Sequence, residues 1–104
     1  MTTAHIQLPQ EAIGDLCRRY HIRRLALFGS VLRDDFRPDS DVDILYDFDP
    51  DAHMTLLDVV TLQEELQNLL GRPVDLASYW GIEHSESPTR RRTILSSAQV
   101  VYET

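Results

Sequence analysis

The stretch that decides the fold is LALFGSVLRDDFRPDSDVDILYDFDPD, residues 25–51. It begins with an apolar run typical of a short strand, turns at Gly29-Ser30, and continues into the alternating sequence DVDILY at residues 41–46. It also contains eight aspartates, whose like charges repel one another and weaken a compact fold. This clustering suggests that some of the carboxylates bind a ligand.

Alternating helices and strands are predicted on both sides of this stretch. We expect helices at 9–20, 30–36, 56–70 and 88–98, strands at 23–28, 41–46 and 73–78, an irregular connection at 79–88, and an extended or docked segment at 100–102. The helix at 56–70 is expected to end at Gly71 and to bury an apolar stripe made of Leu56, Val59, Val60, Leu62, Leu66, Leu69 and Leu70. The order favours an α+β (α/β-like) fold, a small β-sheet flanked by helices.

Composition restricts the class of protein. With 104 residues, of which 42% are apolar, the chain is expected to form a single domain, 1–104, with one modest core. No apolar run approaches the roughly 18 residues of a membrane span. The N-terminus lacks a secretion signal and Cys17 stands alone, so we expect a cytoplasmic protein. The net charge of −7 disfavours direct nucleic-acid binding, and the absence of lysine excludes a Walker-A loop.

The Gly29-Ser30 pair is a candidate phosphate site. Glycine permits a tight turn and a close approach of backbone to ligand, and Ser30 can cap the helix predicted to follow. The free N–H groups of a first helical turn favour an anion. A Gly-Ser pair alone is a weak signal, because most such pairs are ordinary turns.

Asp41 and Asp43 are candidate metal ligands. On a strand, residues two apart face the same way and lie roughly 6.6 Å apart along the chain. Magnesium is usually held by one or two carboxylates, with water and substrate phosphate completing its shell. A phosphate-binding turn followed by metal-binding carboxylates is far more specific than either part alone.

Asp75 is the candidate for a third carboxylate, which would complete a two-metal site. It lies in an otherwise apolar strand, where a charge is costly unless it is paired or metal-bound. The plain alternative is a strand-end carboxylate that caps a local group. The other aspartates of the region are interpreted as solvated loop residues: Asp34, Asp35, Asp47, Asp49 and Asp51. The run at 90–92, three arginines, is interpreted as a solvated helix face or, alternatively, as a contact for phosphate or an acidic partner.

Two other metal sites fit the sequence poorly. The segment from Asp39 to Asp43 imitates the start of a calcium-binding loop, but Ile44 replaces the required glycine and Pro50 the bidentate glutamate. The four histidines and the single cysteine lack the spacing of zinc ligands.

Gly29-Ser30, ten intervening residues and Asp41-x-Asp43 resemble the signature of the DNA polymerase beta-like nucleotidyltransferase superfamily. The stretch LFGSVLRDDFRPDSDVDILYDF, with TLLDVVTLQEELQNLLGRPVDLAS and RRRTILSSAQVVYE after it, is similar to the smallest branch, the minimal nucleotidyltransferase (MNT) antitoxins. The likeness covers nearly the whole chain from about Arg24. The ten-residue spacing is the strong part of the match.

The resemblance implies a nucleotidyltransferase fold with a mixed β-sheet and an active site at the sheet edge. It implies that Gly29 and Ser30 grip the triphosphate of ATP, that Asp41 and Asp43 hold two magnesium ions, and that Asp75 is the third carboxylate. Arg33 matches an arginine common three residues after the serine. Similar proteins are antitoxins that transfer AMP from ATP onto a tyrosine of a HEPN ribonuclease toxin, which implies a hetero-oligomer. Larger superfamily members carry a second domain that this chain lacks, so its acceptor site would come from the partner.

The mechanism expected from these residues is attack of a hydroxyl on the α-phosphorus of ATP. Asp75 could receive the proton of that hydroxyl, and Arg33 or Arg37 could contact the triphosphate. Two alternatives remain open at this point. The chain could be a non-catalytic antitoxin that blocks its toxin by stoichiometric contact, or a nucleotidyltransferase that acts on a small molecule.

Overall fold

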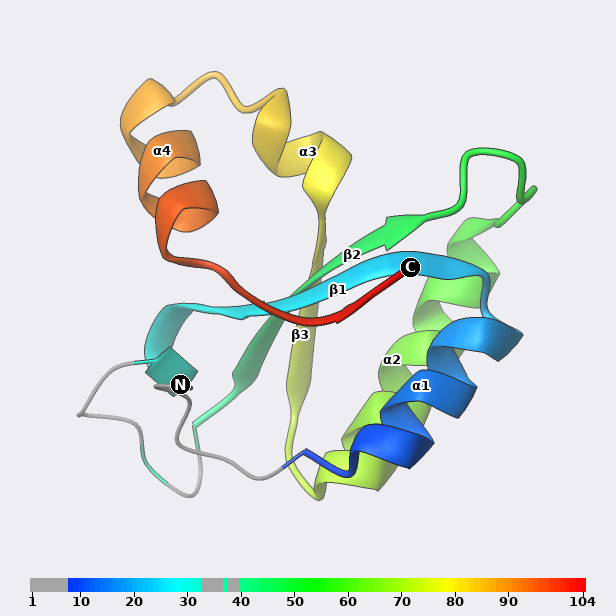
Figure 1. Ribbon diagram of the computed structural model, residues 1–104. Helices are drawn as coiled ribbons and strands as arrows, with labels where there is room; N and C mark the ends of the chain where they lie inside the picture. Colours follow the sequence, from blue (N-terminus) through cyan, green and yellow to red (C-terminus); the bar gives the residue numbers. More distant parts are fainter. Residues whose placement is uncertain (1–7, 33–36, 38–39) are drawn as a thin grey trace.

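The computed structural model describes residues 8–32, 37 and 40–104. Within that part of the chain a four-stranded sheet is covered by α1 and α2 on one face and by α3 and α4 on the other (Figure 1). The strands are β1 (Ile22–Phe28), β2 (Val42–Phe48), β3 (Val74–Ser78) and β4 (Gln99–Glu103). The helices are α1 (Gln10–Arg19), α2 (Leu56–Leu70), α3 (Tyr79–Glu83) and α4 (Pro88–Ser97).

The strand order is β3-β2-β1-β4. Strand β1 pairs antiparallel with both β2 and β4, whereas β2 and β3 run parallel, so the predicted mixed sheet is confirmed. The parallel pair requires a crossover, which α2 supplies. The segment expected to be extended at 100–102 is strand β4, which pairs with β1 although more than 70 residues separate them in sequence.

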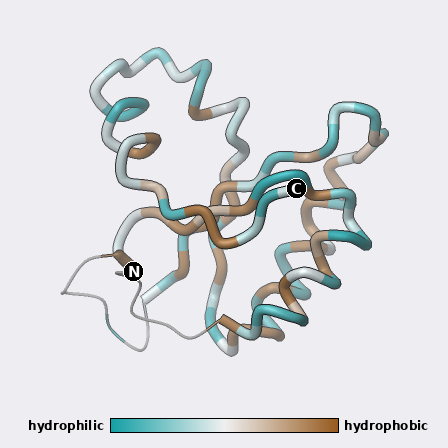
Figure 2. The backbone as a smooth tube through the Cα atoms, in the orientation of Figure 1, coloured by the Kyte–Doolittle hydropathy of each residue, from teal (hydrophilic) through white to brown (hydrophobic). Residues whose placement is uncertain are grey.

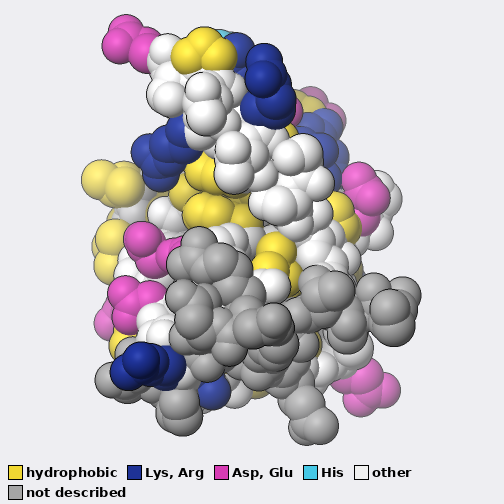
Figure 3. Space-filling view, turned by 90° about the vertical axis from the view of Figure 1, so that its left-hand side faces the viewer, with side chains coloured by type: hydrophobic (Ala, Val, Ile, Leu, Met, Phe, Trp, Pro, Cys, Tyr) yellow, Lys and Arg dark blue, Asp and Glu magenta, His cyan; other side chains and the backbone are white. Residues whose placement is uncertain are grey.

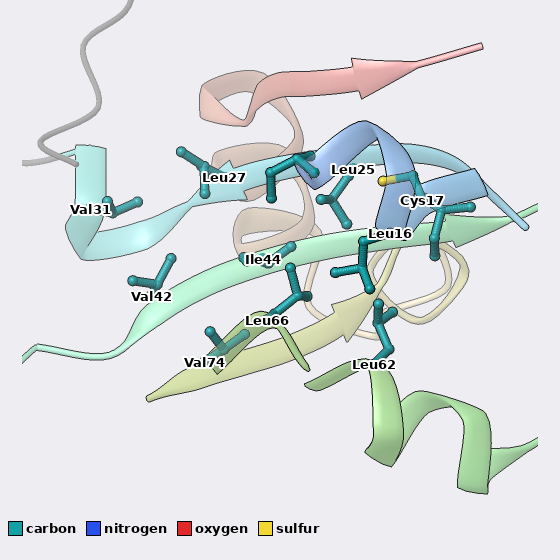
Figure 4. Close-up of a cluster of buried hydrophobic side chains, with 12 residues drawn as sticks. Leu16, Cys17, Leu25, Leu27, Val31, Val42, Ile44, Leu62, Leu66 and Val74 are labelled. Atoms are coloured by element: carbon teal, nitrogen blue, oxygen red, sulfur yellow. The ribbon is translucent and has the colours of Figure 1, made fainter. Parts of the chain in front are cut away.

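The larger core fills the space between the sheet and helices α1 and α2 (Figure 4). Leu16 and Cys17 come from α1 and Leu62 and Leu66 from α2, and all four are buried against alternate residues of the strands. The strand residues that complete this cluster are Ile22, Leu25, Leu27, Val42, Ile44 and Val74. Because side chains alternate along a strand, the strand residues that face α1 and α2 are followed by residues that face α3 and α4.

Helix α2 begins and ends as its sequence predicts. Thr55 and Asp58 form a reciprocal capping box at its start, and Gly71, with a φ of 69°, ends it in the left-handed conformation. The predicted buried stripe is wrong at its beginning, because Leu56 is 79% exposed and Val60 45% exposed. The core covers the middle of α2, where Leu62 and Leu66 are buried, and the first turn extends past it.

The second layer is smaller and lies over the opposite face of the sheet. Ala26 and Leu45 of the strands are buried under Tyr79 and Ile82 of α3, and Ile94 of α4 packs beside them. The connection predicted to be irregular at 79–88 therefore contains a helix, α3, which the Ser78 hydroxyl caps by accepting from the Gly81 N–H. Figure 2 shows the contrast between the brown strands at the centre and the white and teal α3–α4 connection.

The chain turns at the end of β1 through a 3-10 helix, η1 (Gly29–Leu32). The predicted helix at 30–36 is therefore a 3-10 turn as far as Leu32, and residues 33–36 lie outside the described part. Among the helices of the described residues, none is long and apolar enough to span a membrane.

Candidate active site

Gly29 lies against the carboxylate of Asp43. Its φ is +76°, a left-handed conformation that glycine adopts without steric cost. A Cβ built on Gly29 would lie 2.2 Å from Oδ2 of Asp43, far inside van der Waals contact. The position therefore requires glycine for two reasons, its backbone conformation and the carboxylate beside it. The turn after β1 and the first carboxylate of β2 are therefore in direct contact.

Asp43 and Asp75 are aligned across the parallel strands β2 and β3, because they are partners in the register of the pair. Residues paired in this way share a face of the sheet. This is the face opposite the larger core, because Val42, Ile44 and Val74, the neighbours of the two aspartates, are buried in that core. Asp43 is half-buried and Asp75 is exposed.

Asp41 stands one residue before β2 and is exposed. The hydroxyl of Ser30 donates a long hydrogen bond, 3.5 Å, to its backbone carbonyl. This bond joins the turn after β1 to the beginning of β2. The role predicted for the Ser30 side chain, a cap on the helix that follows, is replaced by this contact between two segments.

Two glutamines of α2 hold the beginning of β3 in place. Gln67 Oε1 accepts a hydrogen bond from the Val74 N–H at 3.0 Å, and Gln63 Nε2 donates one to the Val74 carbonyl at 2.8 Å. An edge strand leaves the N–H and C=O groups of alternate residues without strand partners, and these two side chains satisfy both groups of Val74. Because Asp75 follows Val74 directly, α2 fixes the backbone from which the third predicted carboxylate extends.

The structure brings some of the predicted site residues together and leaves others apart. Gly29 contacts Asp43, and Ser30 contacts the backbone of Asp41. Within residues 8–32, 37 and 40–104, no three His, Cys, Asp or Glu side chains form a group that could hold a metal ion, so the three carboxylates are not gathered into one closed cluster. Arg33 lies outside the described residues. Arg37 is exposed, and its carbonyl accepts a hydrogen bond from Arg72.

A cleft of about 670 Å³ opens beside Gly29, between the end of β1 and helix α4. Figure 3 looks onto this side of the molecule and shows hydrophobic side chains below α4 with basic side chains near them. The residues that line the cleft are Phe28, Gly29, Leu32, Arg90, Thr93, Ile94 and Ser97. The cleft has the size of small-molecule sites in proteins.

The residues of α4 in this cleft were not identified from the sequence, apart from the arginine run. They recur at i, i+3, i+4 and i+7, starting from Arg90, which is the spacing of one helix face. That spacing was visible, but a helix face alone does not say whether it packs on a core or lines a cleft. Within the run, Arg90 lines the cleft, whereas Arg91 donates a hydrogen bond to the Ser85 carbonyl and so fixes the α3–α4 connection.

Comparison with known proteins places this geometry in a family. A family model described as a nucleotidyltransferase domain matches residues 10–101. Protein adenylyltransferase MntA of Thermococcus cleftensis is 36% identical over 81 residues, which are 78% of this chain and 80% of that protein. A structure described as a minimal nucleotidyltransferase is 39% identical, with a TM-score of 0.66, covering 86% of this chain and 85% of the other.

Two further solved structures share the fold at lower identity. A chain of a toxin–antitoxin assembly with AMP-PNP is 21% identical, with a TM-score of 0.68, covering 93% of this chain and 75% of that one. A chain from a complex of tri-AMPylated HEPN toxin with MNT antitoxin, from Shewanella oneidensis, is 20% identical, with a TM-score of 0.54, covering 91% and 70%. The family model and the two relatives that are 36% and 39% identical show that the chain belongs to the nucleotidyltransferase domain family and, within it, to the minimal nucleotidyltransferases.

Proposed function

We propose that residues 1–104 act as one minimal catalytic domain. This domain transfers AMP from ATP to the hydroxyl of a tyrosine on a HEPN toxin partner. The observation that carries this proposal is the contact between Gly29 and the Asp43 carboxylate, which supports a phosphate-binding role for the turn and a metal-binding role for the side chain beside it. The 36% identity to a protein adenylyltransferase supports the reaction. The fold shared with a complex of an AMPylated HEPN toxin and MNT antitoxin supports the partner.

The residues assigned to the phosphates are Gly29, Ser30 and Arg33. A glycine with a φ of +76° leaves its backbone open on the side that a Cβ would cover, which suits close approach of a phosphate oxygen. Arginine suits bidentate contact with phosphate, and we assign this role to Arg33 by its position three residues after Ser30.

The carboxylates assigned to magnesium are Asp41, Asp43 and Asp75, and we propose that they hold two ions. Hard oxygen ligands are those that magnesium prefers, and Asp43 and Asp75 extend from aligned positions on one face of the sheet. Magnesium, when bound, supplies positive charge that stabilises the charge developing on the phosphate oxygens.

The proposed reaction forms a bond between the acceptor hydroxyl oxygen and the α-phosphorus of ATP. The bond from the α-phosphorus to the oxygen that bridges to the β-phosphorus breaks, and pyrophosphate leaves with that electron pair. Asp75 accepts the hydroxyl proton and releases it to water, a role that suits an exposed carboxylate on an edge strand. The acceptor hydroxyl belongs to the partner in this proposal. Because α3 and α4 cover the central strands on this face, the open approach is at the β3 edge of the sheet.

Intact-mass measurement of the partner tests the proposal. The chain is co-expressed with its HEPN toxin, and the expected result is a toxin mass increased by one or more AMP units. The double variant Asp41→Asn with Asp43→Asn should leave the toxin mass unchanged while the two chains still associate. AMP transfer at a near-normal rate by this variant would contradict the assigned carboxylates.

The same measurement distinguishes the two rival functions. A non-catalytic antitoxin would neutralise its toxin with no change in mass. A nucleotidyltransferase with a small-molecule acceptor would release pyrophosphate from ATP without labelling the toxin. The single buried cysteine, Cys17, fits the reducing cytoplasm in which we propose that the pair operates.

A further inference from the structure

We propose that the cleft between β1 and α4 receives the base and ribose of the nucleotide. We also propose that Ser97 selects adenine and cytosine, which carry an amino group at the ring position where guanine and uracil carry a carbonyl oxygen. This inference rests on the proposed function and assigns the part of the nucleotide that Gly29 and the carboxylates do not hold. Five of the seven lining residues are new to the site: Phe28, Leu32, Thr93, Ile94 and Ser97.

The cleft has the composition of a site for a flat, mostly apolar group. Phe28 and Leu32 line one side and Ile94 the other, and Thr93 and Ser97 add hydroxyls. The flat faces of a nucleotide base pack against apolar and aromatic side chains of a protein, and a few polar groups of the protein contact the edge of the base. Arg90 adds a cation to the same lining, where it suits the negative charge of the nucleotide.

The position of the cleft fits the nucleotide better than the acceptor. Gly29 is shared between the cleft and the contact with Asp43, and Phe28 is the register partner of Asp43 across β1 and β2. The cleft thus lies on the β1 side of the carboxylates. Asp75, which we assign to the acceptor, extends from the edge strand β3, and β2 lies between β3 and β1. A nucleotide whose phosphates lie at Gly29 would extend its base toward α4 and leave the β3 edge to the acceptor.

Ser97 gives the cleft a preference between bases. Its hydroxyl donates to the Thr93 carbonyl at 2.6 Å, with a weaker second contact to the Ile94 carbonyl at 3.4 Å. A hydroxyl has a single proton, so while Ser97 makes this bond it offers a ligand its lone pairs and no donor. Adenine and cytosine present an amino donor at the position where guanine and uracil carry a carbonyl oxygen. Ser97 therefore favours ATP and CTP over GTP and UTP.

The first test separates the base from the phosphates by filling the cleft. Thr93 is exposed on α4, so Thr93→Trp places an indole in the cleft without entering the core. The binding of ATP and of inorganic tripolyphosphate, each with magnesium, is measured by calorimetry. We expect ATP to bind roughly tenfold or more weakly, a loss of about 1.4 kcal/mol or more, and tripolyphosphate to bind as in the parent. The control is Thr89→Trp, one turn earlier on α4 and outside the cleft lining.

The outcomes distinguish this inference from the function on which it rests. Unchanged ATP affinity in Thr93→Trp, with transfer to the toxin lost, would assign the cleft to the acceptor side chain and overturn the inference while the function stands. A parent protein that binds neither ATP nor tripolyphosphate would overturn both.

The second test addresses selection by Ser97. In the parent, ATP and CTP should bind more tightly than GTP and UTP. Ser97→Ala should weaken ATP binding by about two- to tenfold and leave GTP binding unchanged or improved. Ser96→Ala is the matched control, because Ser96 also donates to the Thr93 carbonyl, at 3.4 Å, but lies outside the cleft lining. Equal affinity for the four nucleotides in the parent, or an equal effect of both serine variants, would overturn the assignment.

Discussion

The Asp43 carboxylate occupies the space into which any side chain at position 29 would extend, with Oδ2 2.2 Å from the place of a Cβ. Gly29 begins η1 directly after β1, Asp43 lies near the start of β2, and the segment that joins them carries Ser30. The glycine therefore does more than allow a turn. It allows the first carboxylate of β2 to lie directly on the backbone of the segment that we assign to the phosphates.

Gly29→Ala should separate catalysis from stability when it is compared with Gly71→Ala. Both glycines have a positive φ, +76° and +69°, so both variants should lose about 1–2 kcal/mol of unfolding free energy from backbone strain. A Cβ at Gly71 meets nothing within 4 Å, whereas at Gly29 it displaces Asp43. We expect AMP transfer to fall about 100-fold in Gly29→Ala alone, as for a catalytic group misplaced by about 1 Å. Equal activity of the two variants would contradict the role of Asp43.

Magnesium and ATP together should raise the melting temperature. A ligand present at about ten times its Kd adds about 1.4 kcal/mol to the unfolding free energy, which corresponds to roughly 6–11 °C for a domain of this size. Thermal unfolding with and without both ligands measures the shift. The Asp41→Asn, Asp43→Asn variant should show almost none, and a full shift in this variant would place the ligands elsewhere.

Asp75→Asn should affect turnover more than nucleotide binding. The residue is exposed on the edge strand and is assigned to the acceptor proton, so its loss should lower kcat by about 100-fold or more. The KM for ATP should change little, because we place the nucleotide on the β1 side. Asp51→Asn, an exposed aspartate of the loop after β2, is the matched control. Comparable losses in both variants would remove Asp75 from the mechanism.

The contact between α1 and α2 should make stability depend on pH. Tyr20 donates its hydroxyl to Glu65, and this bond, followed by the contact with Arg19, lowers the pKa of Glu65. The same bond, followed by burial, raises the pKa of Tyr20 to about 12. The Glu65 contribution is present above its ordinary pKa of 4.5 and is lost as pH falls through the lowered value. The Tyr20 contribution is present below its ordinary pKa of 10.0 and is lost as pH rises through about 12.

Tyr20→Phe should therefore destabilise the protein most between about pH 5 and 9, with the difference from the parent shrinking outside that window. Urea unfolding across the pH range measures it. Tyr102→Phe, in a half-buried tyrosine of β4, controls for the loss of a hydroxyl. A difference between Tyr20→Phe and the parent that stays constant at every pH would contradict the linkage.

Two neighbouring arginines of β1 allow a second pair of matched variants to be compared. Arg23 and Arg24 both donate to Oδ2 of Asp47, at 2.6 and 3.1 Å. The guanidinium of Arg24 also lies 3.7 Å from the ring centroid of Tyr79, the buried residue that begins α3. Arg24→Lys loses the flat stacking contact, so it should lower the unfolding free energy by about 1 kcal/mol more than Arg23→Lys. Equal losses on chemical denaturation would show that the stacking is worth nothing.

Most elements could be predicted because their signals are local. The helix at 56–70 has a capping box and a terminal glycine, and the residues on either side of the Gly29 turn have the periodicity of strands. The exposed first turn of α2 could not be predicted, because Leu56 and Val60 fit the apolar pattern of the helix and their exposure depends on where the core ends. The helix α3 was missed because five residues are too short for a periodic pattern.

The candidate site divides in the same way. Ser30, Asp41 and Asp43 lie within one short stretch of the chain, and their spacing can be read directly. The sequence alone therefore determined which residues to consider and which family they match. The pairing of Asp43 with Asp75, the contact of Asp43 with Gly29, and the cleft under α4 depend on strand register and on how α4 packs over the sheet. Tertiary structure decided these, because register and packing are set by contacts between residues far apart in the chain, and no local pattern encodes them.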